Sequence, residues 1–259
     1  HAQHSNNIEA GRVAQALSRQ LQAVTQREFI ATLASTGTEA IEAAIKHAKM
    51  EIRGKANQQA KHLENMAALI QDQYRKQRLS LKPEVLTQAS VLFKQPITDL
   101  TTLYQAIREH NQTALNREPL FIALSHSFHG MTSGALSLTA SYDFRNPFYW
   151  MGVRSRWIPH RADGLQAAIR DEIQPVYTLD NDHQGFIGFI GRDWLSIAAL
   201  LIEPIQGEGG IHPVNREFVQ AARHLADQYG FPIIVDEIQC GMGRSGTFTA
   251  AEQAGLRGD

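Results

Sequence analysis

Three short segments place side chains that can do chemistry at the ends of apolar runs. Residues 36–38 are Thr-Gly-Thr, residues 128–130 are Phe-His-Gly, and residues 236–239 begin with Asp and end with Gln. A glycine turn at a helix N-terminus offers free backbone N–H groups to a phosphate. An aromatic side chain offers a flat apolar face, and a carboxylate can keep a ring nitrogen protonated. Together these groups are suited to bind pyridoxal phosphate.

A competing motif lies immediately downstream. Residues 241–246 read Gly-Met-Gly-Arg-Ser-Gly, the G-x-G-x-x-G spacing of a dinucleotide-binding turn. Asp236 and Glu237 precede it and would repel a pyrophosphate, and Glu252 is too close in sequence to be the acid that binds the ribose. We therefore interpret the motif as a glycine-rich turn, and an NAD-dependent dehydrogenase remains a rival hypothesis.

The elements that must position these segments alternate between strands and helices. A capping box of Thr36 and Glu39 predicts where one helix begins, and Gly230 is typical of the residue that ends another. This alternation predicts an α/β domain with a mostly parallel sheet, whose ligands lie at the carboxyl ends of the strands. We expect helices over 10–24, from 37, over 164–172 and 213–229, strands over 29–33, 120–124, 197–202 and 232–235, and a polar loop over 179–187.

Residues 51–117 follow a different pattern. They contain one glycine and many Gln and Lys residues, and Pro83 and Pro96 separate their helices. Two apolar stripes at helical spacing predict a helical insertion with a polar surface, at the periphery of the α/β domain. The positions of the stripes are Leu63, Met66, Ile70 and Tyr74, then Leu100, Leu103, Tyr104 and Ile107.

The composition narrows the class of protein. The chain has 259 residues, 43% of them apolar, and its 25 Lys+Arg and 26 Asp+Glu give a net charge of −1. This balance argues against a nucleic-acid partner. A membrane span is not expected, because the longest apolar run covers only residues 197–202. The single cysteine, Cys240, and a first stretch of nine residues without an apolar run predict a reducing, cytoplasmic location and no metal site.

Four blocks of sequence resemble the class III (ω-amino acid) aminotransferases, which have the pyridoxal-phosphate fold type I. The resemblance covers residues 10–50 and 120–259 and leaves 51–117 unmatched. It implies a three-layer α/β sandwich with a mostly parallel sheet, of which residues 1–259 are an incomplete large domain. The blocks are STGTEAIEAAIK at 35–46, FHGMTSGALS at 128–137, IEPIQGEGG at 202–210 and IVDEIQCGMGRSG at 234–246.

The resemblance also implies the reaction and the residues of the site. A homodimer would move an amino group from an amine or ω-amino acid to a carbonyl acceptor, a 2-oxo acid or an aldehyde. Asp236 would be the catalytic carboxylate at the pyridine nitrogen, Phe128 and Ile238 would lie on opposite faces of the ring, and Gln239 would reach the ring hydroxyl. The cofactor-binding positions are Thr36, Gly37, Thr38, Phe128, His129, Asp236, Ile238 and Gln239, and the substrate-facing glutamates are Glu203 and Glu208.

One feature of the family pattern falls outside this sequence. The family's Schiff-base lysine would follow the segment that begins Gly258-Asp259, about six residues beyond its end. We therefore expect residues 1–259 to be a central fragment that lacks this lysine. The alternative is a non-catalytic domain of the same fold that binds a partner through residues 51–117.

Overall fold

A four-stranded sheet forms the centre of the protein. The computed structural model describes residues 8–259; the first seven residues, on which much of the prediction about a secretion signal rests, lie outside the described part. The strands lie in the order β3 (Ser155–Ile158), β2 (Leu120–Leu124), β6 (Ile197–Ile202) and β9 (Ile233–Val235), and every neighbouring pair is parallel. The predicted strands at β2, β6 and β9 are confirmed.

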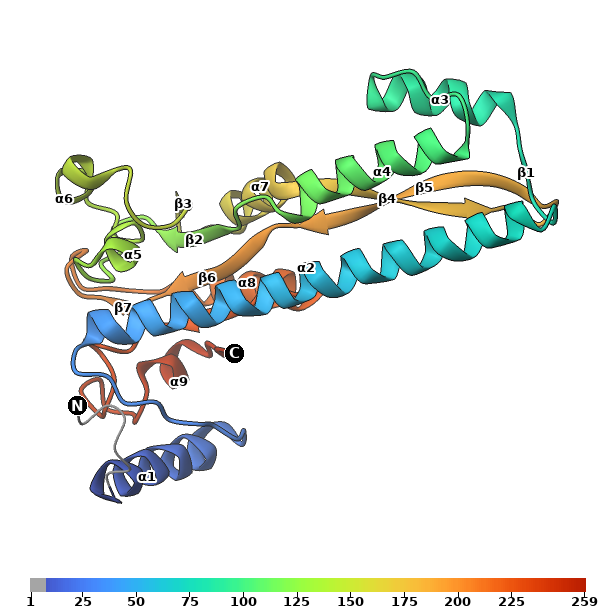
Figure 1. Cartoon of the computed structure of the whole chain (residues 1–259). Coiled ribbons are helices and arrows are strands. Elements are labelled where there is room, and N and C mark those ends of the chain that lie inside the picture. Colours follow the sequence, from blue (N-terminus) through green and yellow to red (C-terminus); the bar gives the residue numbers. More distant parts are fainter. Residues whose placement is uncertain (1–7) are drawn as a thin grey trace.

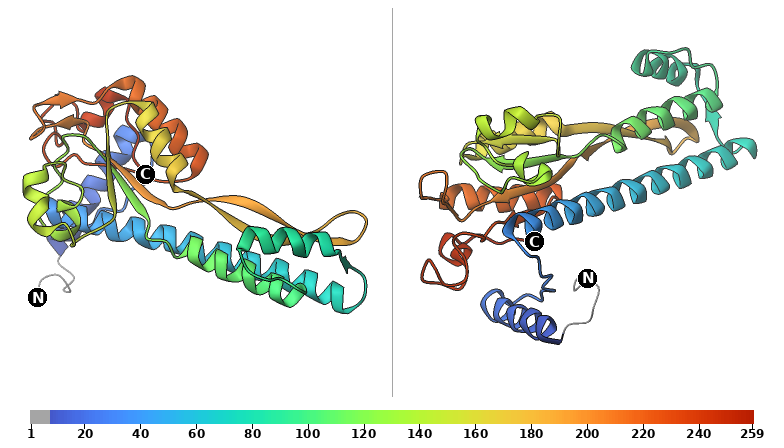
Figure 2. Two further views of the ribbon diagram at one scale, coloured as in Figure 1. Left: turned by 90° about the horizontal axis from the view of Figure 1, so that it is seen from above. Right: turned by 60° about the vertical axis from the view of Figure 1, so that its left-hand side comes forward.

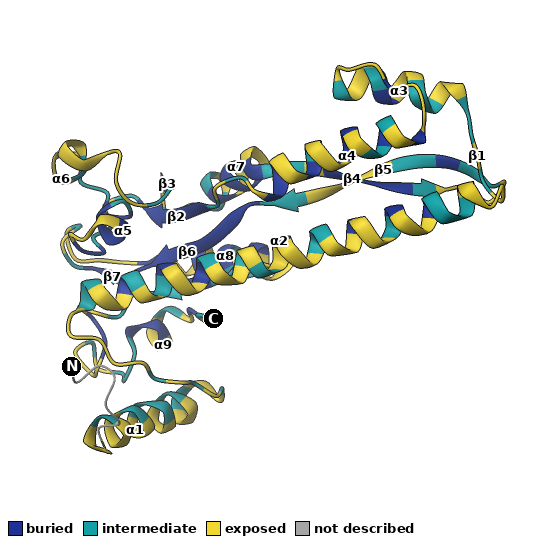
Figure 3. Ribbon diagram, viewed as in Figure 1, coloured by how far each residue is buried: buried dark blue, intermediate teal, exposed yellow. Residues whose placement is uncertain are grey.

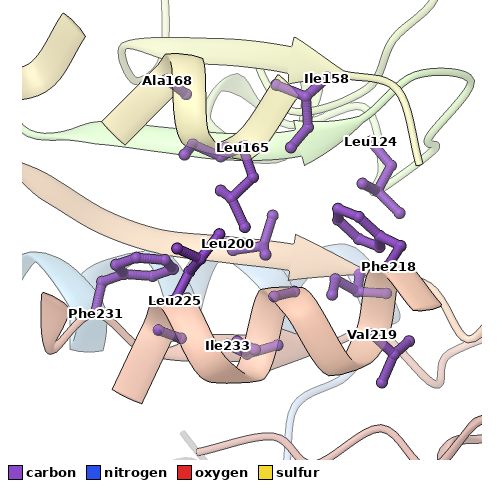
Figure 4. Close-up of a cluster of buried hydrophobic side chains, with 14 of the residues drawn as sticks. Leu124, Ile158, Leu165, Ala168, Leu200, Phe218, Val219, Leu225, Phe231 and Ile233 are labelled. Atoms are coloured by element: carbon purple, nitrogen blue, oxygen red, sulfur yellow. The ribbon is translucent and has the colours of Figure 1, made fainter. Parts of the chain in front are cut away.

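Helices cover both faces of this sheet, because β2 and β6 are apolar and buried throughout. On one face, Leu200 and Ile202 pack with α7 (Ala162–Glu172) and α8 (Arg216–Tyr229), as Figure 4 shows for the cluster around Leu165, Phe218 and Leu225. On the other face, Ala199 and Leu201 pack against α2 (Gly37–Arg75) and the short α5 (Ser133–Leu136). The predicted three-layer α/β sandwich with a mostly parallel sheet is confirmed.

Capping residues set the two ends of α8, which the spacing of its apolar residues alone does not locate. Gly230 ends the helix with φ 74° and its N–H bonds to the carbonyl of Ala226, as predicted. The predicted start at residue 213 is three residues too early. Pro213 lies in β8 (His212–Pro213), which pairs with β7 (Ile205–Gln206), and the side chain of Asn215 caps the helix by accepting from the amide of Glu217 at 2.7 Å.

An arm extends away from the sheet, on the right in Figure 1 and in the left view of Figure 2. Its spine is the distal part of α2, a single 39-residue helix that continues without interruption into residues 51–117. Beside it lie β1 (Ser80–Leu81), α3 (Pro83–Phe93) and α4 (Leu100–Leu115). The fifth component is an antiparallel hairpin of β4 (Ile173–Asn181) and β5 (Phe186–Leu195), whose second strand pairs with β1.

The prediction of a polar loop at 179–187 was wrong, because it describes only the turn of this hairpin. The carboxylate of Asp182 accepts from the amides of Gln184 and Phe186 and so forms the turn. On either side of it, Leu179 and Ile187 are buried beneath the helices of the arm. The strands are stabilised by packing against the helices of the arm, and no local pattern in their own sequence predicts this packing.

The arm has a hydrophobic core of its own. Leu103 and Ile107 of α4 pack with Leu179 and Ile187 of the hairpin, and Leu103 is completely buried. Asn111 of α4 also fixes the hairpin, because its side-chain amide donates to the carbonyl of Tyr177 at 2.7 Å and accepts from the amide of the same residue at 2.8 Å. In Figure 3 the buried positions of the arm face inward between α2, α4 and the hairpin.

The N-terminal segment packs least. Helix α1 (Ile8–Thr25) confirms the predicted helix over 10–24, but none of its residues is buried. The predicted strand at 29–33 was wrong: the segment pairs with no strand among residues 8–259, and Ile30 is 97% exposed. The remaining short helices are α6 (Tyr142–Arg145), the 3-10 helix η2 (Asn146–Phe148) and α9 (Ala250–Ala254). No helix in the described part of the chain has the length and apolar character needed to cross a bilayer.

The core of the arm yields a stability prediction. Leu103→Ala should lower the free energy of unfolding by about 2–5 kcal/mol, because it leaves a cavity at a fully buried position. The control Val91→Ala, at a 76% exposed position of α3, should change it by less than about 0.5 kcal/mol. Urea unfolding followed by circular dichroism measures both variants. Equal effects of the two substitutions would contradict a stabilising core in the arm.

Candidate functional site

The chemistry-bearing segments meet in one pocket at the carboxyl ends of β2, β6 and β9. In Figure 1 the arrowheads of β2 and β6 and the first turn of α2 lie at the same end of the sheet. The free volume of the pocket, its open mouth included, is about 660 Å³, which is within the range of small-molecule sites. Its lining residues are Thr38, Phe128, His129, Gly130, Glu203, Ile205, Glu208, Asp236, Ile238 and Gln239.

Eight of the ten residues named from the sequence thus line this pocket, and the other two lie beside it. Thr36 is the N-cap of α2, and Gly37 is in contact range of Ile238. Sequence reasoning missed Gly130 and Ile205. The glycine directly after His129 was a usable signal for the first, whereas Ile205 has no distinguishing local signal.

The first turn of α2 has the form of an anion site. The hydroxyl of Thr36 accepts from the amide of Glu39 at 3.2 Å, which confirms Thr36 as the cap. The reciprocal half of the predicted capping box is shifted by one residue, because the carboxylate of Glu39 accepts from the amide of Ser35 at 2.8 Å. The amides of Gly37 and Thr38 belong to the helix end that has no intrahelical acceptors, so they can donate to a ligand.

Two glycines allow the three segments to approach one another. A Cβ at Gly37 would lie 2.7 Å from a side-chain carbon of Ile238, so only glycine lets the 236–239 turn come this close to α2. Gly130 has φ +124°, and a Cβ there would lie 2.2 Å from the hydroxyl of Thr38. The start of α2 therefore touches both other segments.

A buried hydrogen-bonded pair, His129 and Asp236, occupies the floor of the pocket. His129 Nδ1 and a carboxylate oxygen of Asp236 are 2.7 Å apart, and both side chains are at least 95% buried. The other carboxylate oxygen of Asp236 accepts from the amide of Ile238 at 3.0 Å. These two donors fix the direction of the carboxylate. His129 Nε2 is buried and has no hydrogen-bond partner among residues 8–259.

Glu203 is the second buried carboxyl group of the pocket. It is 6% exposed and accepts from the amide of Phe128 at 3.2 Å. Burial raises the pKa of Glu203 to about 7, and the nearby carboxylates of Asp236 and Glu208 act in the same direction, against the opposing effect of His129. At neutral pH Glu203 is therefore close to the midpoint of its titration. Glu208, in contrast to the buried Glu203, lies exposed at the mouth of the pocket.

Gln239 lies against the hairpin that follows β6. A Cβ at Gly207 would overlap the side-chain oxygen of Gln239, so the amide lies directly against the backbone of residue 207. Gln206, in the same hairpin, donates to the carbonyl of Ser125 at 2.9 Å and ties the hairpin to the end of β2. The hairpin thus carries Glu208 and lies against Gln239 on the same side of the pocket.

The glycine-rich motif at 241–246 has a structural role. It lies in consecutive turns, and no helix begins until residue 250, so the strand–glycine–helix arrangement of a dinucleotide site is missing from residues 236–249. Glu237 caps α9, because its carboxylate accepts from the amides of Ala250 and Ala251 at 2.9 and 2.7 Å. The dehydrogenase hypothesis is not supported.

Cys240 is buried, and burial raises the pKa of its thiol to about 11, which keeps it neutral.

Comparison with known proteins agrees with this geometry. Residues 1–259 match the family described as aminotransferase class-III. Putrescine aminotransferase of Pectobacterium atrosepticum is 37% identical over 142 residues, which are 54% of this chain and 26% of that protein. Acetylornithine aminotransferase of Methanosarcina mazei is 33% identical over 141 residues, 54% of this chain and 30% of that protein. The matched parts thus span only about a quarter to a third of these relatives.

A solved structure supports the fold. A thermostable omega transaminase from Pseudomonas jessenii superposes with a TM-score of 0.54 and 17% identity. The superposition covers 99% of this chain and 43% of that one.

The shifted pKa of Glu203 predicts a pH-dependent stability. Its folded-state pKa of about 7 lies above the ordinary value of 4.5, so the folded protein binds the proton more tightly and loses stability as the pH rises between these values. Glu203→Gln removes this titration. Relative to the wild type, the variant should gain up to about 3 kcal/mol between pH 5 and pH 8, measured by urea unfolding. Glu64→Gln, at an exposed position of α2 far along the arm, is the control. A pH-independent difference for Glu203→Gln would refute the assignment.

Proposed function

This chain belongs to the class III aminotransferase family, and on that premise we propose that the whole protein is a pyridoxal-phosphate-dependent transaminase. It moves an amino group from an amine or ω-amino acid to a carbonyl acceptor, a 2-oxo acid or an aldehyde. The observation that carries the proposal is the buried pair of His129 and Asp236 at 2.7 Å, in a pocket that also contains the first turn of α2.

The pocket fits the cofactor on three observations. The amides at the start of α2 suit its phosphate, with Thr36, Gly37 and Thr38 as the binding residues. Asp236 receives one donor on each oxygen and keeps lone pairs for a protonated ring nitrogen. Ile238 is apolar yet 56% exposed in the pocket, as expected of a side chain that a flat ring covers.

The roles proposed for the other residues are those that the family resemblance implies. When bound, the cofactor supplies an electron sink for the charge left on the substrate carbon after a proton is removed. Asp236 would keep the ring nitrogen protonated, and His129, at 2.7 Å from the carboxylate, would orient it. Phe128 would stack on the ring opposite Ile238, and Gln239 would donate to the ring hydroxyl.

The substrate side of the pocket is assigned to Glu203 and Glu208. Because its pKa is raised to about 7, Glu203 can hold a proton at neutral pH and need not repel an incoming carboxylate. Glu208 stays at the mouth, in reach of solvent. The 37% identity to a putrescine aminotransferase supports a terminal amine as the donor.

The organisation of the whole protein is part of the proposal. Residues 1–259 form part of the large cofactor-binding domain, and 51–117 form a helical insertion within it, which the separate core of the arm supports. The protein is a cytoplasmic homodimer without nucleic-acid or membrane partners. If 51–117 instead served a non-catalytic domain as its partner-binding surface, the protein would have no transaminase activity.

The role of Asp236 can be tested directly in the full-length protein. Asp236→Asn keeps the shape of the side chain but removes the charge that stabilises a protonated ring nitrogen, so kcat should fall roughly a thousandfold. Turnover is measured with a diamine donor such as putrescine and a 2-oxo acid acceptor, and cofactor content by absorbance. Asp171→Asn, which changes an exposed aspartate of α7 paired with Arg156 at 2.6 Å, is the control. Wild-type turnover by Asp236→Asn with cofactor bound would remove Asp236 from this role.

A further inference from the structure

Glu42 joins two parts of the pocket that the sequence places far apart. It lies on the second turn of α2, and one of its carboxylate oxygens accepts three hydrogen bonds from the segment that follows the Phe128–Gly130 turn. The donors are the hydroxyl of Thr132 at 2.6 Å, the amide of Gly134 at 2.8 Å and the amide of Ala135 at 3.2 Å. A single side chain therefore caps the N-terminus of α5 from another helix.

This cap replaces one that α5 does not make for itself. The N-cap residue of α5 is Thr132, whose side chain makes no capping bond to the helix and whose hydroxyl donates to Glu42. The first amides of a helix have no intrahelical acceptors, and here an anionic carboxylate satisfies two of them, which is the charge that a helix N-terminus favours. A Cβ at Gly134 would lie 2.5 Å from a carboxylate oxygen of Glu42, so the carboxylate would have to shift if residue 134 carried a side chain.

The segment held by Glu42 is hydrogen-bonded to residues 127–130, the last three of which line the pocket. The hydroxyl of Thr139 donates to the carbonyl of Gly130 and accepts from the amide of His129, both at 3.0 Å. Ser127 donates its hydroxyl to the carbonyl of Leu138 at 2.8 Å. Residues 127–140 therefore form one closed loop, and a shift of α5 moves the Phe128–Gly130 turn with it.

The same face of α2 makes a second contact with this loop. Thr38 precedes Glu42 by four residues, so the two side chains share one face of the helix. Thr38 lies against Gly130 at the cofactor end, and Glu42 binds Thr132 and α5 one turn further on. With two attachment points, both the distance and the angle between α2 and the loop are fixed.

We infer that Glu42 is a positioning residue for cofactor binding: its carboxylate sets the spacing between the phosphate-binding end of α2 and the ring-stacking face of Phe128. The inference rests on the proposed function for the identity of the ligand. It assigns no contact between Glu42 and the cofactor, because Glu42 acts through the loop.

The test compares substitutions of Glu42 in the full-length protein. Glu42→Ala should weaken the binding of added pyridoxal phosphate to the apoprotein at least about tenfold, because three hydrogen bonds to a charged group are lost. The visible circular dichroism of the bound cofactor should fall as well, since its ring is held less firmly. Glu42→Gln retains an oxygen acceptor and should restore most of the affinity. The matched control is Glu64→Ala, which changes an exposed glutamate on the arm portion of the same helix.

Thr132→Val provides a second variant that leaves the packing of α2 intact. It removes one of the three donors at an exposed position, and it should weaken cofactor binding about threefold in the wild-type background. In the Glu42→Ala background the same substitution should have no further effect, because residues that act through one shared contact are not additive. Additive effects, or wild-type affinity and dichroism for Glu42→Ala, would overturn the inference.

Hydrogen exchange of the apoprotein separates this inference from the proposed function. Peptides covering 128–137 should exchange faster in Glu42→Ala than in the wild type, while peptides of α8 should not change. If the wild type fails to bind pyridoxal phosphate, the proposed function fails whatever the exchange shows. If the wild type binds the cofactor and the exchange at 128–137 is unchanged in Glu42→Ala, the positioning role of Glu42 is refuted.

Discussion

The parallel direction of the central strands is the constraint on which the site depends. Because β2, β6 and β9 run the same way, their carboxyl ends lie at one edge of the sheet. The residues that follow each strand, around 128, 203 and 236, are thereby collected in one place although more than a hundred positions separate the first from the last. The two buried apolar faces of the sheet hold this arrangement between α7 and α8 on one side and α2 on the other.

The two buried carboxyl groups of the pocket, Asp236 and Glu203, have different surroundings. Asp236 has an imidazole at 2.7 Å and a backbone amide at 3.0 Å, which compensate for the loss of water around the charge. Glu203 has one backbone amide and neighbouring carboxylates, and its pKa rises to about 7. Two carboxyl groups in one pocket with such different environments can serve different purposes, Asp236 as an oriented hydrogen-bond acceptor and Glu203 as a group that gains and loses a proton.

The arm has a hydrophobic core that is separate from the pocket. Its core contains residues from α2, α4 and the β4–β5 hairpin. The first link to the sheet is the chain itself, because α2 is continuous, β4 directly follows α7, and β5 leads into β6. A second link is Glu172, at the junction between α7 and β4, which is buried and binds the guanidinium groups of Arg154 and Arg117. The same helix therefore begins at the pocket and ends in the core of the arm.

Local signals in the sequence determined much of this protein. The apolar runs at 120–124 and 197–202, the cap at Thr36 and the glycine at 230 each act over a few residues, so β2, β6, the start of α2 and the end of α8 could be predicted. The order of the motif blocks also identified nearly every residue of the pocket. The tertiary structure alone decided that His129 pairs with Asp236, that Glu237 caps α9, that Glu42 holds the loop at 132–135, and that residues 173–195 form a hairpin. Each of these depends on which surfaces pack together, and hydrogen bonds between segments up to 107 residues apart leave no periodic pattern in the chain.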